Sequence, residues 1–330
     1  MNKKIVTILL ISGALFLNAC KKNTDVFVPD PGQSNGADTA WNAVLPATAP
    51  VYSLQTNLLS ISTEPVKDSF EISTANAVTI LTSNGVQCTF PPLCCVTTAG
   101  QIVTGKVYVE IRLVKTRGDM IMVNKPTISN GNLLVSGGEL FISLSKNGQA
   151  VQLAPNARIY LRYSDVPTNQ QMKLFLGDES NAAQFNWKPS TSSTDTVGVG
   201  PQFYEIATSH LRWINCDYFY DTSGITRSLV SAVLPSNYTN ANTSAFLVFR
   251  DFRSVLGMYG DVPERRFLSG KVPNGKLATV VVISKQGNDY FLGKETITTG
   301  VNVSTANVQK VSVNPVKTSL ADIRLYLATL

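Results

Sequence analysis

Residues 106–115 read KVYVEIRLVK, and their spacing of apolar residues is the clearest indication of the fold class. Apolar residues occupy every second position, namely Val107, Val109, Ile111 and Leu113. The positions between them hold Tyr108, Glu110 and Arg112. Side chains alternate between the two faces of an extended strand, so one face of this segment is apolar and the other can meet water. The pattern therefore predicts a half-buried β-strand.

The same alternation returns further along the chain. ELFISLS at residues 139–145 and ARIYLRY at 157–163 again place apolar residues on one face. Asn-Gly pairs follow or separate such runs at residues 84–85, 130–131 and 147–148. Asn-Gly accepts the positive φ angles of a tight hairpin turn, so it is a strong hairpin signal. Several short strands joined by such turns predict an antiparallel β-sandwich.

The last third of the chain is also rich in β-branched and aromatic residues, which favour strands. Its candidate strands are QFYEIA, LRWINCDYFY, AFLVFRDF, LATVVVIS and DYFLG. The period changes near the C-terminus, where helical spacing relates Leu320, Ile323, Leu327 and Leu330. Ser319 or Thr318 is the expected N-cap, because a hydroxyl there can accept a backbone hydrogen bond from the first turn. We predict one short C-terminal helix.

The first residues are typical of a secretory signal peptide. Lys3 and Lys4 precede an apolar stretch of thirteen residues, 5–17. A helix that crosses a bilayer needs about 20 apolar residues, so this stretch is too short to be a membrane span. We therefore assign residues 1–19 to a signal peptide that is removed on export.

Residues 17–20, LNAC, resemble the lipobox of bacterial lipoproteins. The resemblance implies cleavage between Ala19 and Cys20, and lipid and palmitate-type acyl attachment at Cys20. Because two acyl chains already anchor a protein stably, such a group would hold the chain on a membrane. Lys21 follows the cysteine, where the known inner-membrane retention rule needs Asp. The resemblance therefore implies the outer membrane, with the periplasmic and surface faces both left open.

The remaining chain divides by composition. Residues 20–60 are rich in Pro, Gly, Asn, Asp and Ala over most of their length and predict a flexible tether. Residues 61–165 are the first predicted β-sandwich domain, residues 166–200 a connector, and residues 201–330 a second β-rich domain that ends in the helix. The predicted fold is thus all-β, with two antiparallel β-sandwich-like domains after a tether.

Residues 67–85, 89–92 and 100–153 resemble the ZU5-like β-sandwich of ankyrin-type scaffold proteins, and most closely its Bacteroidota-type lipoprotein versions. The shared features are a G-x-V-x-V-x-I strand at residues 105–111 and a Ser-Gly-Gly turn at 136–138. The resemblance implies a scaffolding or interaction module. Some ZU5-containing proteins cleave themselves at His-Phe-Ser, but His210 is the one histidine and Leu211 follows it. We therefore expect no autoproteolysis.

The charges argue against nucleic acid as a partner. The leader carries two lysines and no acid, so its removal lowers the net charge from +6 to +4. No block of Lys or Arg is longer than two residues, and aromatic residues are not interleaved with basic ones. Nucleic-acid binding normally shows clustered basic residues, so we predict none.

Four cysteines follow the lipobox: Cys88, Cys94, Cys95 and Cys216. An exported chain meets an oxidising compartment, which favours pairing of Cys88 with Cys94 or Cys95 across the loop TFPPL. The alternative is that these thiols are buried and free. One histidine and a C-x₅-C-C spacing do not match zinc-ligand spacing, so no metal site is predicted. Gly198-Val199-Gly200 lacks the third glycine of a nucleotide fingerprint, and no cofactor is predicted.

Catalytic patterns are weak. Ser209 and His210 are adjacent, so on a strand they would point to opposite faces. No G-x-S-x-G elbow occurs. Acids such as Asp178, Glu179, Asp217 and Glu264 have no distinguishing setting. We assign no catalytic residue.

Aromatic residues crowd residues 213–220, with Trp187 upstream. Alternation puts Trp213 on the face opposite Ile214, Cys216 and Tyr218, so Trp213 is the candidate ligand-facing aromatic. Core packing is the competing interpretation. The sequence therefore favours a non-enzymatic, lipid-anchored cell-envelope protein that binds or scaffolds envelope proteins. The alternatives are a surface glycan-binding lipoprotein and, less favoured, a hydrolase of envelope or other polysaccharides.

Overall fold

The computed structural model describes residues 40–73, 75–180 and 185–330. The predicted signal peptide, Ala19 and Cys20 lie outside the described residues, as does the first part of the predicted tether. The chain is mostly β, with 49% strand and 9% helix, as the sequence predicted. No helix in the described part of the chain is both long and apolar enough to cross a membrane.

The first sheet has nine strands and contains the strand predicted at residues 106–115. Its main path is β1 (Val66–Ile72), β5 (Gly105–Val114), β7 (Asn132–Lys146), β14 (Arg212–Phe219), β10 (Lys173–Asp178) and β11 (Asn186–Pro189). The short strands β4 (Cys95–Thr97), β6 (Ile128–Ser129) and β8 (Gln149–Leu153) complete it. Val107, Val109 and Ile111 of β5 are buried, which confirms the predicted period up to Ile111. At the end of the strand Leu113 is half-buried and Val114 is buried instead.

The second sheet has five strands and packs on one face of the first. Its order is β12 (Thr196–Val199), β13 (Phe203–Thr208), β9 (Ile159–Ser164), β3 (Gln87–Phe90) and β2 (Val78–Leu81). Side chains of both sheets form one hydrophobic core, in which Ile111 and Ile142 of the first sheet join Leu161 and Ile206 of the second. These two sheets therefore make a β-sandwich.

The third sheet is formed by the last part of the chain. Its main path is β19 (Val272–Pro273), β15 (Arg227–Val233), β18 (Arg266–Leu268), β17 (Val255–Asp261), β16 (Thr243–Phe249), β20 (Leu277–Gln286), β21 (Asp289–Thr298) and β23 (Val316–Thr318). A ninth strand, β22 (Val308–Ser312), pairs in parallel with β15. The other strand pairs in the described chain are antiparallel, and one face of this sheet has a core of its own.

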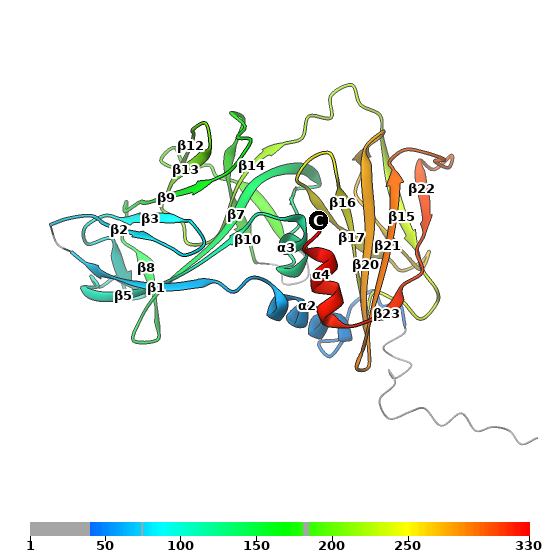
Figure 1. Ribbon diagram of the computed structural model, residues 1–330, viewed down its shortest axis with the longest axis horizontal. Helices are drawn as coiled ribbons and strands as arrows, with labels where there is room; N and C mark the ends of the chain where they lie inside the picture. Colours follow the sequence, from blue (N-terminus) through cyan, green and yellow to red (C-terminus); the bar gives the residue numbers. More distant parts are fainter. Residues whose placement is uncertain (1–39, 74, 181–184) are drawn as a thin grey trace, which may run out of the picture. The chain divides into compact units, whose positions relative to one another are not determined.

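In the part of the chain that the structure describes, three helices lie between the first and third sheets: α2 (Pro50–Ile61), α3 (Arg117–Met122) and α4 (Leu320–Leu327) (Figure 1). They share a core with Trp213 of β14 and Val281 of β20. Arg117 of α3 also donates hydrogen bonds to the carbonyl oxygens of Leu330 and Phe252, at 2.8 and 3.1 Å. The two β-rich parts are therefore joined by packing as well as by the chain.

The predicted C-terminal helix is confirmed, with Ser319 as its N-cap. Two boundaries differ from the prediction. Residues 50–60 were assigned to the tether and residue 61 to the first domain, but residues 50–61 form α2, because Leu54 and Leu58 can bury their side chains against α3, α4 and the third sheet. The composition of the predicted tether does not reveal the apolar surface, formed by α3, α4 and the third sheet, against which α2 packs.

The strand pairings also move the predicted division between domains. The predicted connector, residues 166–200, supplies β10, β11 and β12 to the first two sheets. β13 and β14 belong to the predicted second domain in sequence, yet β13 pairs with β9, and β14 pairs with β7 and β10. The first β-sandwich therefore extends to Phe219, and the third sheet begins at Arg227.

Candidate functional site

The outer face of the second sheet carries the candidate site. Alternate side chains of β3, β9 and β13, such as Cys88, Leu161 and Ile206, pack into the core shared with the first sheet. Because successive side chains of a strand point to opposite faces, the residues between these positions point away from that core. The strand registers then decide which of the outward residues become neighbours.

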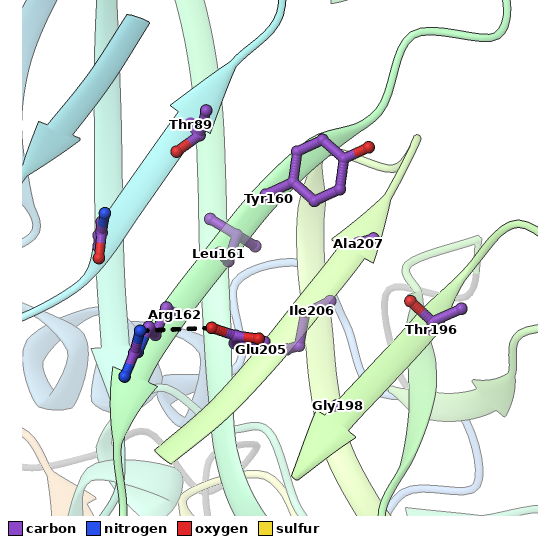
Figure 2. A pocket seen from close by; sticks show the side chains of 10 residues that line it. Thr89, Tyr160, Leu161, Arg162, Thr196, Gly198, Glu205, Ile206 and Ala207 are labelled. Carbon is purple, nitrogen blue, oxygen red and sulfur yellow. Dashed lines mark ion pairs between the residues drawn. The ribbon is translucent and has the colours of Figure 1, made fainter. Parts of the chain in front are cut away.

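Two rows of outward side chains cross the sheet from β12 to β2. The first row is Gly198, Glu205, Arg162, Gln87 and Leu81. The second row is Thr196, Ala207, Tyr160, Thr89 and Thr79. The first row thus carries the charged and amide groups, and the second row carries hydroxyl groups around one aromatic ring (Figure 2).

A pocket of about 390 Å³ opens over these rows. The pocket is deepest at Gly198 and Ala207, because these two residues are the smallest that line it. The ring of Tyr160 stands beside Ala207 and remains 49% exposed. Thr89 and Thr79 continue the row beyond the ring, with their hydroxyl oxygens 2.8 Å apart. We call this hollow, with its lining residues, the sheet-face pocket.

Two contacts hold the guanidinium group of Arg162 in place at the pocket. It lies over the ring of Phe203, with 3.6 Å between Cζ and the ring centroid. Its Nη1 is also 3.4 Å from the Glu205 carboxylate oxygen Oε1. The two side chains are 48% and 54% exposed, so the ion pair adds little to stability. The main effect of the ion pair is to hold the donors of Arg162 and the acceptors of Glu205 at the pocket.

The pocket can recognise a polar ligand that has one apolar face. Arg162 supplies only donors, Glu205 only acceptors, and Gln87 and the threonines supply both. Tyr160 supplies an apolar ring face with a polar tip. Hydrogen bonds that involve the charged groups are the stronger ones, so Arg162 and Glu205 would contribute most to affinity.

No sequence motif marks these residues as a site. The alternation of ARIYLRY identified Ile159, Leu161 and Tyr163 as the apolar face, which left Tyr160 and Arg162 on the other face. What it could not show is that Glu205 and Gln87, far away in the chain, lie on either side of Arg162. That neighbourhood depends on the order of strands in the sheet.

Trp213 is not the exposed aromatic that the sequence predicted. It is 8% exposed and packs against Phe141, with 5.2 Å between ring centroids. Lys125 Nζ lies 5.3 Å from the centroid of the same ring. The reason is that β14 runs inside the first sheet, with the second sheet covering one face and the helices and third sheet covering the other.

All four cysteines of the described chain are free thiols, and each is at most 1% exposed. The structure therefore does not contain the predicted bridge from Cys88 to Cys94 or Cys95; it shows the alternative of buried thiols. The Cys94 and Cys95 sulfur atoms are 3.6 Å apart, a hydrogen-bonding rather than a bonded distance. Burial raises the pKa of the Cys88 and Cys216 thiols.

The adjacent pair Ser209 and His210 does not form a nucleophile–base contact among the described hydrogen bonds. His210 Nε2 lies 3.4 Å from the buried Asp195 carboxylate oxygen Oδ2, which also accepts a hydrogen bond from Ser190 Oγ at 2.5 Å. The candidate acids also have separate partners or surroundings. Asp178 pairs with Lys188, Glu179 pairs with Arg212, and Asp217 is fully buried.

Comparison of the chain with protein-family models, with curated proteins and with solved structures finds no match. Among residues 40–73, 75–180 and 185–330, no group of three or more His, Cys, Asp or Glu side chains could hold a metal ion.

Proposed function

We propose that this chain is a non-catalytic glycan-binding protein held at the cell envelope by a lipid on Cys20. The sheet-face pocket is the ligand site. The observation that supports it is the exposed ring of Tyr160, which stands between hydroxyl, amide and charged side chains on an open face.

Sugar rings fit this chemistry. A pyranose ring has an apolar face of C–H groups, which packs well on an aromatic ring, and hydroxyl groups around its edge. Each hydroxyl can donate and accept, so it can bond to Glu205 and to Arg162 at once. Ala207 and Gly198 leave space for the ring beside Tyr160. An open face also lets a longer chain extend beyond the pocket on both sides.

Affinity electrophoresis through soluble neutral polysaccharides tests the ligand class. We expect at least one glucan, mannan, xylan or galactan to retard the protein. Tyr160→Ala should weaken that binding about tenfold or more, because truncating a central aromatic contact costs on the order of 2 kcal/mol. Arg162→Gln should weaken it as well.

Tyr108→Ala is the matched control. Tyr108 is also 49% exposed, but it lies on β5 of the first sheet and does not line the pocket. Its replacement should leave retardation unchanged. Equal losses for Tyr108→Ala and Tyr160→Ala, or no retardation by any polysaccharide, would remove the glycan proposal and leave binding or scaffolding of envelope proteins as the alternative.

The membrane placement is tested separately. Wild-type protein should sediment with the outer-membrane fraction, and Cys20→Ser should release it into the soluble fraction because the acyl chains supply the anchoring energy. Mass spectrometry of the mature N-terminus should show an acylated cysteine. A mature chain that begins at another residue would contradict the placement, whatever the glycan assay shows.

A further inference from the structure

A second pocket, of about 250 Å³, lies where the first sandwich meets the third sheet. Its lining residues are Gly131, Asn132, Leu133, Phe219, Tyr220, Thr222, Arg227 and Lys271. They come from the β6–β7 turn and the start of β7, from the end of β14 with the segment after it, from the start of β15, and from the residue before β19. We call this hollow the junction pocket. None of its residues lines the sheet-face pocket.

The junction pocket is lined by two cations and no acid. Arg227 and Lys271 are exposed, and neither side chain has an ion pair or hydrogen bond within the described ranges. The acid nearest to Arg227 in the sequence is Asp221, which does not line the pocket. Its carboxylate accepts a hydrogen bond from the backbone N–H of Ser223 at 2.8 Å. Two positive charges around one hollow repel each other, and a bound anion would relieve that repulsion.

Aromatic rings form the wall beside these charges. Phe219 is 40% exposed, and its ring packs edge-on against Phe175 at 5.3 Å. Tyr220 stacks on Phe252 at 4.5 Å, and its backbone N–H donates to the Leu133 carbonyl oxygen at 2.9 Å. The wall is therefore held in place by its own packing. Asn132 and Thr222 add groups that can donate and accept.

We propose that the junction pocket binds the anionic group of an acidic sugar, a carboxylate or a phosphate carried on a saccharide ring. The cations bind the anionic group, and the aromatic wall takes the apolar face of the ring. A guanidinium group can bind either anion through two parallel hydrogen bonds, which makes Arg227 the main contact. This site is separate from the sheet-face pocket and does not depend on the ligand bound there.

Titration calorimetry of the full chain with three monosaccharide probes tests the proposal. The probes are galacturonate, galactose 6-phosphate and neutral galactose, so the two sources of negative charge are compared with the uncharged ring. We expect one or both charged probes to bind at least about tenfold more tightly than galactose. The binding should weaken as salt is raised, because exposed charges are screened.

Arg227→Gln should weaken binding of the charged probe about tenfold, since a hydrogen bond to a charged group contributes that much. Lys271→Gln should weaken it by a smaller factor. Lys67→Gln, an exposed lysine on β1, is the charge-matched control and should have no effect. Tyr160→Ala should also have no effect, which separates this site from the sheet-face pocket.

Three results would overturn the proposal. They are equal binding of galactose and the charged probes, equal losses for Lys67→Gln and Arg227→Gln, and no binding of either charged probe. Each result leaves the neutral-polysaccharide assay untouched, so failure here is distinguishable from failure of the proposed function.

Discussion

The carboxyl groups of Glu139 and Asp217 lie buried on neighbouring strands of the first sheet. Glu139 of β7 pairs with Asn215, two residues before Asp217, and the register between β7 and β14 shifts just before Asp217. Both side chains are 0% exposed. Both oxygens of Glu139 and one of Asp217 have no hydrogen-bond partner within the described structure. Burial raises the pKa of both carboxyl groups well above the usual range, and the nearby Asp217 carboxyl group raises the pKa of Glu139 further.

These raised pKa values predict that stability falls as the pH rises. Below the ordinary pKa values of 4.5 for Glu139 and 3.8 for Asp217, both carboxyls are protonated in the folded and the unfolded chain. Above them the unfolded chain releases protons that the folded chain keeps. The free energy of unfolding then falls by up to about 1.4 kcal/mol per pH unit for each group, until the pH passes the folded pKa.

Urea denaturation between about pH 5 and 9 measures this effect. Glu139→Gln keeps the shape of the side chain and cannot ionise, so its midpoint should depend less steeply on pH than that of the wild type. Lys125 and Arg253 oppose the shift, because their positive charges lower the pKa of Glu139 and Asp217 respectively. Parallel pH profiles for wild type and Glu139→Gln would show that Glu139 is ionised in the folded protein.

Gly118→Ala should destabilise the protein by about 1–3 kcal/mol through overpacking. A Cβ atom at Gly118 of α3 would lie 1.9 Å from the carbonyl oxygen of Leu327, so α3 and α4 would have to separate. Gly270→Ala is the control, since a Cβ atom there would meet nothing within 4 Å. A thermal midpoint for Gly118→Ala equal to that for Gly270→Ala would contradict the close packing of the two helices.

Ser319→Ala should cost about 1 kcal/mol of stability, because it removes the N-cap of α4. The Ser319 hydroxyl accepts a hydrogen bond from the backbone N–H of Asp322 at 3.0 Å. Ser60→Ala is a suitable control, since Ser60 lies inside α2 and its exposed hydroxyl only donates to the carbonyl oxygen of Asn57. Chemical denaturation should separate the two variants. Similar stabilities would mean that the cap is dispensable.

Asp165→Asn should destabilise the protein by about 1–3 kcal/mol, because it removes a charged hydrogen-bond acceptor from two partly exposed cations. The Asp165 carboxylate is 4% exposed and lies 3.1 Å from Arg253 Nη2 and 3.2 Å from Lys115 Nζ. It therefore links the sandwich to the segment before β17. Asp289→Asn breaks an exposed pair with Lys317 and should cost less than about 1 kcal/mol. A reversed order in the urea midpoints would rule out this link.

The four thiols of the described chain should react with a thiol reagent only after unfolding. Cys88, Cys94, Cys95 and Cys216 are buried, and a thiol must be accessible and ionised to react. Labelling with iodoacetamide should be slow in native buffer and should reach four groups in concentrated guanidinium. Two labelled groups under denaturing, non-reducing conditions would instead reveal the bridge that the sequence suggested.

The alternation of apolar and polar residues predicted which side chains of a strand share a face, because this alternation depends only on the backbone geometry of that strand. KVYVEIRLVK became β5, with Val107 and Ile111 buried, and Ser319 became the cap of α4. The same reasoning failed for Trp213. Its face of β14 looked open in the sequence but is covered by the helices and the third sheet.

The β-rich class, the closing helix and the outward positions of Tyr160 and Arg162 follow from the amino-acid order alone. The neighbours of Arg162, namely Glu205 and Gln87, follow from the order of strands in the second sheet. The shared pocket of Arg227 and Lys271 and the packed helix at residues 50–61 likewise depend on how the sheets pack. Side-chain period and turn chemistry act between residues that are close in the chain. Strand order and sheet packing instead depend on burying surfaces from distant segments together, which no local pattern records.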